Sequence, residues 1–286
     1  MKADRVLFPE DGITRRDLLA YYTWVAPALL PHLADRAVTV RRWPHGIAEP
    51  GFFQKHPAPG QSEPIRITDA ADLLDWVALG AIEFHIPLAP MSDPARHDWA
   101  VLDFDPQPPL GRDAAWRAAR AAAAVCDRLG IPFRAKTSGQ RGLHLFVPLV
   151  PTPARDAFGA VERLAHLIRA VLPDLVTLEW RRARRGPRVL LDVGQNARHR
   201  TMAVVYSVRA RPGAPVSWPI APRELLRPPG PPPTVKTVGQ GAVPAWERPP
   251  AVDLAERLDA FGVPPLEVLR RLGATAGGWS AVPMPD

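Results

Sequence analysis

The sequence predicts an α+β fold, in which helices pack on a mixed or antiparallel β-sheet. The chain has 286 residues, of which 47% are hydrophobic, so a large domain with a sizeable core can form. Segments with helical periodicity and short β-branched segments follow one another without strict alternation. Parallel βαβ units would produce that alternation, so their absence favours a mixed or antiparallel sheet.

In the first half of the chain, capping residues and apolar spacing predict two helices among three strands. Thr14 can cap a helix because Asp17 follows three residues later, and apolar side chains then recur at helical spacing. Thr68 and Gly80 are the expected cap and end of a second helix. In chain order we expect a helix through 18–29, a strand over 38–42, a helix over 69–79 and strands over 82–86 and 99–104.

The second half continues with the same mixture of elements. An Ala-rich segment that ends at Gly130 predicts a helix, and Pro173 ends the next one. In chain order we expect a helix over 113–129, strands over 131–135 and 143–149, a helix over 154–172, strands over 176–180, 188–193 and 203–208 with a turn at 184–187, and two short helices over 253–261 and 265–272. We therefore divide the chain into a catalytic domain (1–227), a Pro-rich strap that completes it (228–250) and a helical tail (251–286).

Charge and composition limit the class of protein. The net charge is +7 and arginine supplies nearly all of the basic residues, with seven arginines between residues 181 and 200 alone. Arginine matches phosphate groups with a planar fork, so this stretch indicates a polyanion-binding surface. The chain has no apolar run long enough to span a membrane and no signal peptide at residues 1–10, so we expect a cytoplasmic, nucleoid-associated protein. The single Cys126 excludes an internal disulfide and a multi-cysteine zinc site.

Three aspartates could form a metal site. Asp103 and Asp105 close an apolar strand and, two residues apart, share one face of it. Asp192 ends a second apolar segment. Carboxylates suit Mg²⁺ or Mn²⁺, and three of them fit a two-metal phosphoryl-transfer site. Taken alone, an Asp-x-Asp at a strand end is more often part of a turn or a helix cap, and Asp192 could likewise belong to a turn before Gly194.

A second candidate site follows the predicted strand at 131–135. Two glycines, Gly139 and Gly142, lie close to Ser138, Arg141 and His144. Glycine lets a backbone approach a ligand and direct N–H groups at phosphate, so the segment favours anion binding. The alternative is a hairpin turn followed by a core histidine. The sequence at 206–217 adds a basic strand edge.

Taken together, these segments resemble the polymerase domain of bacterial ATP-dependent ligase D, a member of the archaeo-eukaryotic primase superfamily that acts in non-homologous end joining. The resemblance covers about residues 2–246. It rests on ordered motifs at 5–10, 13–15, 41–46, 52–56, 82–85, 103–106, 136–148, 192–196 and 206–215.

The resemblance implies specific roles. The metal-binding and catalytic residues would be Asp103, Asp105 and Asp192. The nucleotide-binding residues would be His85, Ser138, Arg141, His144, Gln195 and Arg209. The residues that bind DNA and its 5′-phosphate would be Lys2, Arg5, Arg15, Arg41, Arg42, Phe52, Phe53 and Lys55. Arginine replaces the family's lysine at positions 5, 15 and 141, which keeps the charge and changes the geometry of the contact.

The resemblance also implies a function. We expect a template-dependent nucleotidyltransferase that fills gaps and extends DNA ends, with a preference for ribonucleoside over deoxyribonucleoside triphosphates. Two Mn²⁺ or Mg²⁺ ions, and no zinc, would serve as cofactors. Its partners would be DNA gaps with a 5′-phosphate, Ku and a separate ATP-dependent ligase, because the chain carries no ligase or phosphoesterase domain.

Two other classes of function remain open at this point, together with a close variant of the favoured one. Three aspartates and a histidine also fit a two-metal nuclease or phosphoesterase, and the basic surface alone would suffice for a non-catalytic module that binds DNA ends. A primase that starts strands without a primer is the variant. Nucleotide-dependent product growth separates the polymerase from both other classes.

Overall fold

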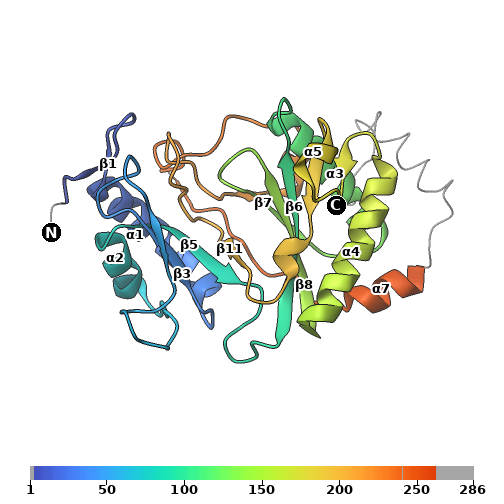
Figure 1. The fold of residues 1–286 in the computed structure, drawn as a ribbon, viewed down its shortest axis with the longest axis horizontal. Coiled ribbons are helices and arrows are strands. Elements are labelled where there is room, and N and C mark those ends of the chain that lie inside the picture. Colours follow the sequence, from blue (N-terminus) through green and yellow to red (C-terminus); the bar gives the residue numbers. More distant parts are fainter. Residues whose placement is uncertain (1–2, 240, 262–286) are drawn as a thin grey trace.

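Two β-sheets form the centre of the molecule, and helices cover their outer faces (Figure 1). The computed structural model describes residues 3–239 and 241–261. The larger sheet has the strand order β12 (Pro219–Ile220), β7 (Arg134–Thr137), β8 (Leu143–Pro153), β6 (Arg96–Pro106), β10 (Val189–Asp192) and β9 (Val176–Thr177). The smaller sheet has the order β11 (Thr201–Ala203), β5 (Ala81–Pro87), β3 (Thr39–Arg42) and β4 (Phe52–Gln54). Only the β9–β10 pair among these strands is parallel, so the predicted mixed sheet is confirmed.

Four helices provide most of the cover. They are α1 (Arg15–Leu33) and α2 (Ala70–Ala78) on the smaller sheet, and α3 (Arg112–Arg128) and α4 (Ala154–Val171) on the larger one (Figure 1). The remaining elements are short: a β1–β2 hairpin (Val6–Phe8, Ile13–Thr14), α5 (Arg182–Arg185), the 3₁₀ helix η1 (Gly194–Asn196), α6 (Pro222–Leu225) and α7 (Leu254–Phe261). No helix within the described ranges is long and apolar enough to cross a membrane.

The alternation of side chains along β6 divides the core in two. Ala100, Leu102 and Phe104 pack in the apolar cluster under α3 and α4. Trp99 and Val101 belong to a second cluster, which also contains the buried side chains of α1 and the smaller sheet. Because side chains two residues apart share a face, Asp103 and Asp105 continue the second series. The carboxylates therefore lie on the face of the larger sheet that is turned toward the smaller one.

Several boundaries differ from the sequence prediction. Asp69, not Thr68, caps α2, because the Asp69 carboxylate accepts from the N–H of Asp72 while both N–H and hydroxyl of Thr68 donate to the Asp72 carboxylate. Strand β7 begins at Arg134 rather than at residue 131. The strand predicted over 203–208 ends at Ala203, since Tyr206 has a positive φ of 67° and the chain turns there. The helix predicted over 265–272 lies outside the described residues.

The Pro-rich segment after α6 lies against the core and includes a turn at residues 234–238. Val235 and Trp246 are buried, and Arg134 Nε donates to the carbonyl oxygen of Glu247 at 2.9 Å. The Asp98 carboxylate binds Arg248 from this segment and Arg36 from the end of α1, each at 2.7 Å. The segment therefore connects elements of both sheets.

Candidate active site

A cavity of about 390 Å³ between the two sheets collects nine of the predicted site residues. They are the three predicted metal ligands and the six predicted nucleotide ligands: Asp103, Asp105, Asp192, His85, Ser138, Arg141, His144, Gln195 and Arg209. These side chains are spread over 125 residues of sequence, yet they line one space. The fold thus brings the two candidate sites of the sequence together.

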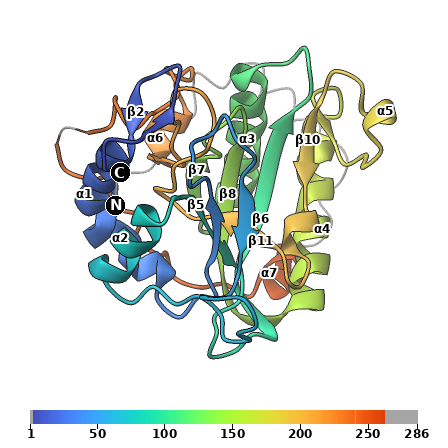
Figure 2. The same cartoon turned by 60° about the vertical axis from the view of Figure 1, so that its left-hand side comes forward.

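Four polar residues form one row across the centre of the larger sheet. The strands β7, β8, β6 and β10 follow one another from left to right in Figure 2. In the register of these strands Lys136 opposes His144, His144 opposes Asp103, and Asp103 opposes Asp192. Directly opposed residues of antiparallel strands have their side chains on the same face. Asp192 therefore lies beside Asp103, although 89 positions separate the two in sequence.

Burial and mutual repulsion disfavour the charged form of the carboxylates. Burial raises the pKa of Asp105, and the charge of Asp103 raises it further, against a hydrogen bond of 3.0 Å from Gln107. Burial also raises the pKa of Asp192, and the Gly194 N–H, which donates to its Oδ1 at 2.7 Å, acts in the opposite direction. Neighbouring carboxylates with raised pKa values need a cation to become stable anions.

The donor set fits divalent magnesium or manganese. The three side chains offer only hard carboxylate oxygens, which these ions prefer, and no thiol lines the cavity. Across residues 3–239 and 241–261, no group of three His, Cys, Asp or Glu side chains is already arranged to hold a metal ion. Asp192 in particular is bound to Gly194 N–H and, at 3.4 Å, to the amide of Gln195. Three-ligand binding therefore requires side-chain adjustment around a shared cavity.

His144 is connected to the carboxylates and to a buried lysine. Its Nε2 lies 3.4 Å from Asp103 Oδ1, and its Nδ1 lies 2.8 Å from Lys136 Nζ. Burial lowers the pKa of His144 to about 4, and the neighbouring Lys136 adds to this effect. Burial also lowers the pKa of Lys136, which donates to Ser217 Oγ at 2.7 Å. The sequence analysis gave Lys136 and Ser217 no role, because their contact spans 81 positions.

A buried glutamate links the two predicted nucleotide ligands on the other side of the cavity. Glu83 is 2% exposed, and its carboxylate binds His85 Nε2 at 3.0 Å and Arg209 Nε at 3.2 Å. Burial alone would raise the pKa of Glu83, but the hydrogen bond with His85 and the charge of Arg209 outweigh it and hold the pKa at about 2. Glu83 belongs to the motif at 82–85. Because it lies two residues before His85 on a predicted strand, the sequence indicates that both side chains lie on the same face.

The glycine loop between β7 and β8 is tightly fitted. Ser138 Oγ accepts from the N–H groups of Gln140 and Gly142, at 3.1 and 3.2 Å. Gly139 has a φ of 71°, and a Cβ there would lie 2.4 Å from Cγ of Arg209. A Cβ on Gly142 would lie 2.5 Å from the carbonyl oxygen of Phe104. Close approach therefore requires glycine at both positions, and Gly139 also adopts a backbone conformation that favours glycine.

The predicted 5′-phosphate ligands lie apart from this cavity, near the β1–β2 hairpin. Arg15 is only 7% exposed, and its Nη2 donates to the carbonyl oxygen of Pro44 at 3.0 Å. Its Nε has no hydrogen-bond partner in the described part of the chain. Arg5 approaches His45 Nδ1 at 2.8 Å. Lys2 lies outside the described residues.

The remaining predicted DNA ligands form an aromatic and basic surface on β3 and β4. Phe52 and Phe53 are exposed, and the guanidinium groups of Arg42 and Arg41 lie over their rings at 5.4 and 5.0 Å. Arg42 also donates to Leu79 O and to the amide of Gln54, so its guanidinium is already engaged. Phe53 contacts the ring of His85 edge-on at 5.8 Å, which connects this surface to the cavity. The last of the set, Lys55, is exposed at the end of β4.

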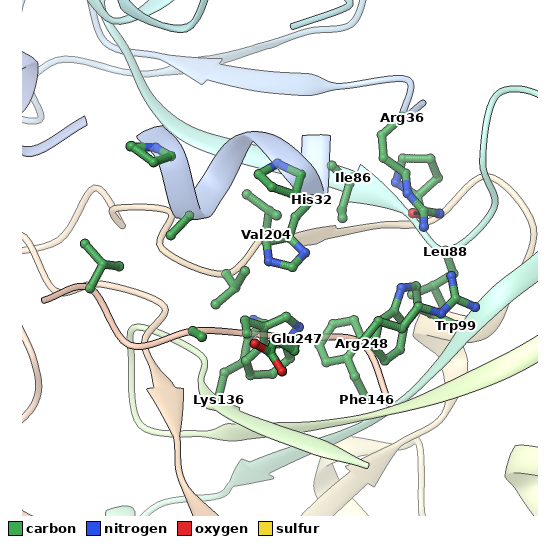
Figure 3. Close-up of a pocket in the computed structure, with 18 of the residues that line it drawn as sticks. His32, Arg36, Ile86, Leu88, Trp99, Lys136, Phe146, Val204, Glu247 and Arg248 are labelled. Atoms are coloured by element: carbon green, nitrogen blue, oxygen red, sulfur yellow. Dashed lines mark hydrogen bonds between the residues drawn. The ribbon is translucent and has the colours of Figure 1, made fainter. Parts of the chain in front are cut away.

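A larger cavity of about 750 Å³ lies away from the carboxylates, between α1 and the Pro-rich segment. In Figure 3, His32 lies on its α1 side, and Lys136, Phe146 and Glu247 lie on the opposite side. Its walls are mostly apolar, with Trp99 among them. Lys136 is the residue through which this cavity adjoins the row of polar side chains.

The fold and the site are those of the primase-polymerase class of proteins: an α+β domain with a carboxylate cavity between two sheets. The family model described as "LigD, primase-polymerase domain" matches residues 14–242. The chain therefore belongs to the LigD primase-polymerase domain family, and the resemblance seen in the sequence is confirmed.

Several characterised relatives share this similarity. The chain is 34% identical over 239 residues to "Multifunctional non-homologous end joining protein LigD" of Mycolicibacterium smegmatis, which covers 75% of this chain and 31% of that protein. It is 32% identical over 236 residues to "Bifunctional non-homologous end joining protein LigD" of Bacillus subtilis, which covers 75% of this chain and 38% of that protein. The chain thus spans about a third of the length of the curated relatives it matches.

A solved structure has the same fold. It is the "Polymerase Domain from Mycobacterium tuberculosis Ligase D in complex with DNA", with a TM-score of 0.77 and 29% sequence identity. The alignment covers 84% of this chain and 92% of the other. The predicted primase-polymerase fold is therefore confirmed.

Proposed function

We propose that this chain is a template-dependent nucleotidyltransferase that fills gaps and extends strands at DNA ends during bacterial non-homologous end joining. The observation that carries the proposal is the position of Asp192 directly beside Asp103, in a cavity that Arg141 and Arg209 also line. Carboxylates for metal ions and cations for a triphosphate are the two parts that nucleotidyl transfer requires. The relatives whose names record non-homologous end joining support the cellular role.

Asp103, Asp105 and Asp192 would hold the metal ions, and two Mn²⁺ or Mg²⁺ ions would supply charge neutralisation and a more acidic 3′-hydroxyl. Arg141 and Arg209 neutralise the triphosphate as pyrophosphate leaves. Ser138, His85 and Gln195 complete the nucleotide contacts.

His144 acts as a neutral hydrogen-bond donor in this scheme. Its lowered pKa keeps the ring uncharged at neutral pH. A neutral imidazole with its proton on Nε2 donates toward Asp103 and the adjacent space of the cavity. It thereby positions oxygen atoms without adding a further charge to the site.

The aromatic and basic surface on β3 and β4, together with the basic residues near the β1–β2 hairpin, holds the DNA. Lys2, Arg5 and Arg15 bind the 5′-phosphate of the downstream strand, and Phe52 and Phe53 stack against bases. Arg41, Arg42 and Lys55 contact the neighbouring backbone. We further propose that ribonucleotides are preferred, that the enzyme acts in the cytoplasm near the nucleoid, and that Ku and a separate ATP-dependent ligase are its partners.

Primer extension on a DNA gap tests this function. A gap with a 5′-phosphate is offered with ribonucleoside or deoxyribonucleoside triphosphates, in Mn²⁺ or Mg²⁺. The parent chain extends the primer, and Asp105→Ala abolishes extension while DNA binding persists, because the substitution removes a metal ligand rather than a phosphate contact. The matched control is Asp174→Ala, an exposed aspartate that does not line the cavity. Full-rate synthesis by Asp105→Ala would refute the assignment.

The same assay separates the competing functions. A two-metal nuclease shortens the labelled strand, and its action does not depend on a nucleoside triphosphate. A non-catalytic module binds the gap and leaves both strands unchanged in either metal. Growth of the primer only when triphosphate is present supports the polymerase and excludes both of these alternatives.

A further inference from the structure

A second, smaller cavity, of about 260 Å³, lies next to the catalytic one. Thr201 lines both cavities, so the two share a wall at the start of β11. We call this second cavity the basic pocket. Its charged and titratable lining consists of Lys55, Arg198, Arg200, His56, His97 and His199, and no aspartate or glutamate lines it. Its electrostatic character is thus opposite to that of the carboxylate end of the catalytic cavity.

The cations of the basic pocket are not engaged within the protein. The side chains of Lys55, Arg198 and Arg200 are exposed, and none of them forms a hydrogen bond or ion pair with any described residue. By contrast, Arg209 in the catalytic cavity is paired with Glu83, and Arg42 on β3 donates to the amide of Gln54. Unpaired cations that surround a concave surface attract anions.

The interior of the basic pocket contains an unsatisfied imidazole. His97 is 3% exposed, and its Nδ1 has no hydrogen-bond partner within residues 3–239 and 241–261. A buried polar nitrogen without a partner is unfavourable, so a ligand that supplies one is stabilised there. Burial lowers the pKa of His97, so its ring is disposed to be neutral, with one donor and one acceptor nitrogen. Such a group suits the edge of a base rather than a phosphate.

The other walls of the basic pocket are apolar. Proline and methionine side chains provide them, namely Pro64, Pro87, Pro90, Pro94 and Met91. Flat, apolar surfaces favour a planar ring system over a fully hydrated inorganic anion. The combination of an apolar interior, one buried imidazole and a cationic rim matches a nucleotide, whose base is planar and whose phosphate is charged.

We propose that the basic pocket holds one unpaired nucleotide of a nucleic-acid strand that continues from the catalytic cavity, with its phosphate at Arg198 and Arg200 and its base beside His97. The proposal rests on the polymerase function proposed above and extends it to the course of the strand. The shared Thr201 supports a continuous path, since a strand that leaves one cavity there enters the other directly.

The test measures how binding depends on the length of a single-stranded extension. Full-length protein binds fluorescent DNA ends whose extensions range from none to eight nucleotides, at several salt concentrations. We expect the affinity of the parent chain to rise with extension length. In Arg198→Ala/Arg200→Ala this gain disappears, and the slope of log K against log salt falls by about 1 for each cation removed. The charge-matched control is Arg223→Ala/Arg227→Ala, two exposed arginines around α6. It retains the gain.

A second variant examines the base contact. His97→Phe keeps a ring of similar size and removes both nitrogens. We expect the rise in DNA affinity with extension length to be about tenfold smaller, with an unchanged slope of log K against log salt. Thermal unfolding monitors whether this buried substitution is tolerated, and the exposed arginine pair keeps the test independent of that result. Equal gains in the arginine variant and its control would overturn the proposal.

Two further measurements separate this proposal from binding of free nucleotides and from failure of the polymerase function. If a nucleoside monophosphate alone abolishes the gain at low concentration, the basic pocket takes free nucleotides and the strand proposal is wrong. Primer extension on the 5′-phosphorylated gap is measured in parallel. Failure of the parent chain to extend that primer contradicts the polymerase function itself, whereas normal extension combined with length-independent binding contradicts only the basic-pocket proposal.

Discussion

Lys136 and His144 face each other across β7 and β8, and Nζ of the lysine lies 2.8 Å from Nδ1 of the histidine. Nε2 of the same ring lies 3.4 Å from Oδ1 of Asp103. A carboxylate oxygen only accepts hydrogen bonds, so the ring proton lies on Nε2 and Nδ1 accepts from Nζ of Lys136. A side chain that does not contact the carboxylates therefore supports the histidine tautomer that presents a proton to them.

Replacing Lys136 with methionine should allow the ring proton of His144 to lie on either nitrogen. The apolar chain fills a similar volume, but Nδ1 of His144 and the hydroxyl of Ser217 lose their donor. We expect extension activity to fall about 10- to 100-fold, as for other residues that orient a ligand. Nitrogen-15 NMR of the histidine rings should show an Nε2–H tautomer in the parent and a mixture in the variant. Lys136→Gln, which keeps one donor, should restore part of both readouts; a variant with an unchanged tautomer and reduced activity would contradict the role.

Gly139→Ala should weaken nucleotide binding by displacing Arg209. The added Cβ would overlap Cγ of Arg209, and a positive φ costs alanine about 1–2 kcal/mol in addition. The KM for the nucleoside triphosphate should rise about tenfold or more, because a charge-assisted contact is lost. Gly60→Ala is the control: its φ of 82° imposes the same backbone cost, but nothing lies within 4 Å of the new Cβ. A similar KM in both variants would exclude the proposed displacement.

His32 should make stability depend on pH below neutrality. Burial lowers its pKa from 6.5 to about 4, with help from Arg36, so the unfolded chain binds the proton more readily than the folded one. Stability from this group is complete above pH 6.5 and is lost as the pH falls toward 4, by about 3 kcal/mol in all. Denaturant unfolding at pH 7 and at pH 4.5 measures the difference. His32→Gln should reduce the difference in unfolding free energy between pH 7 and pH 4.5. An identical difference in both proteins would show that another group is responsible.

Arg15→Ala should selectively weaken binding to gaps that carry a 5′-phosphate. Removing one charged hydrogen-bond donor should lower affinity about 10-fold or more on phosphorylated gaps, with little effect on unphosphorylated ones. The neighbouring Arg16→Ala serves as the control, because Arg16 is exposed and pairs with Asp4. An equal loss on both kinds of gap would mean that Arg15, which is buried against Pro44, acts mainly in folding.

The aspartates could be predicted from sequence because their positions follow local rules. Asp103 and Asp105 share a face through strand periodicity, and Asp192 ends an apolar segment of its own. Glu83 and Lys136 could not be assigned roles in the same way. Their partners, Arg209 and Ser217, are 126 and 81 positions away, so only the pairing of strands brings them together. The prediction of a strand over 203–208 was wrong for a local reason. Tyr206 has a positive φ, and the pattern of apolar residues does not indicate this turn.

Asn196 has a consequence for the path of the chain. Its side-chain amide accepts from the N–H of Val101 at 2.8 Å and donates to the Val101 carbonyl at 2.7 Å, as a neighbouring strand would. Strand β10 can therefore leave the larger sheet directly after Asp192 without exposing the backbone of β6, and the chain continues into β11 of the smaller sheet. One amide thus replaces a length of hydrogen-bonded ladder, and the crossover between sheets occurs right beside a carboxylate.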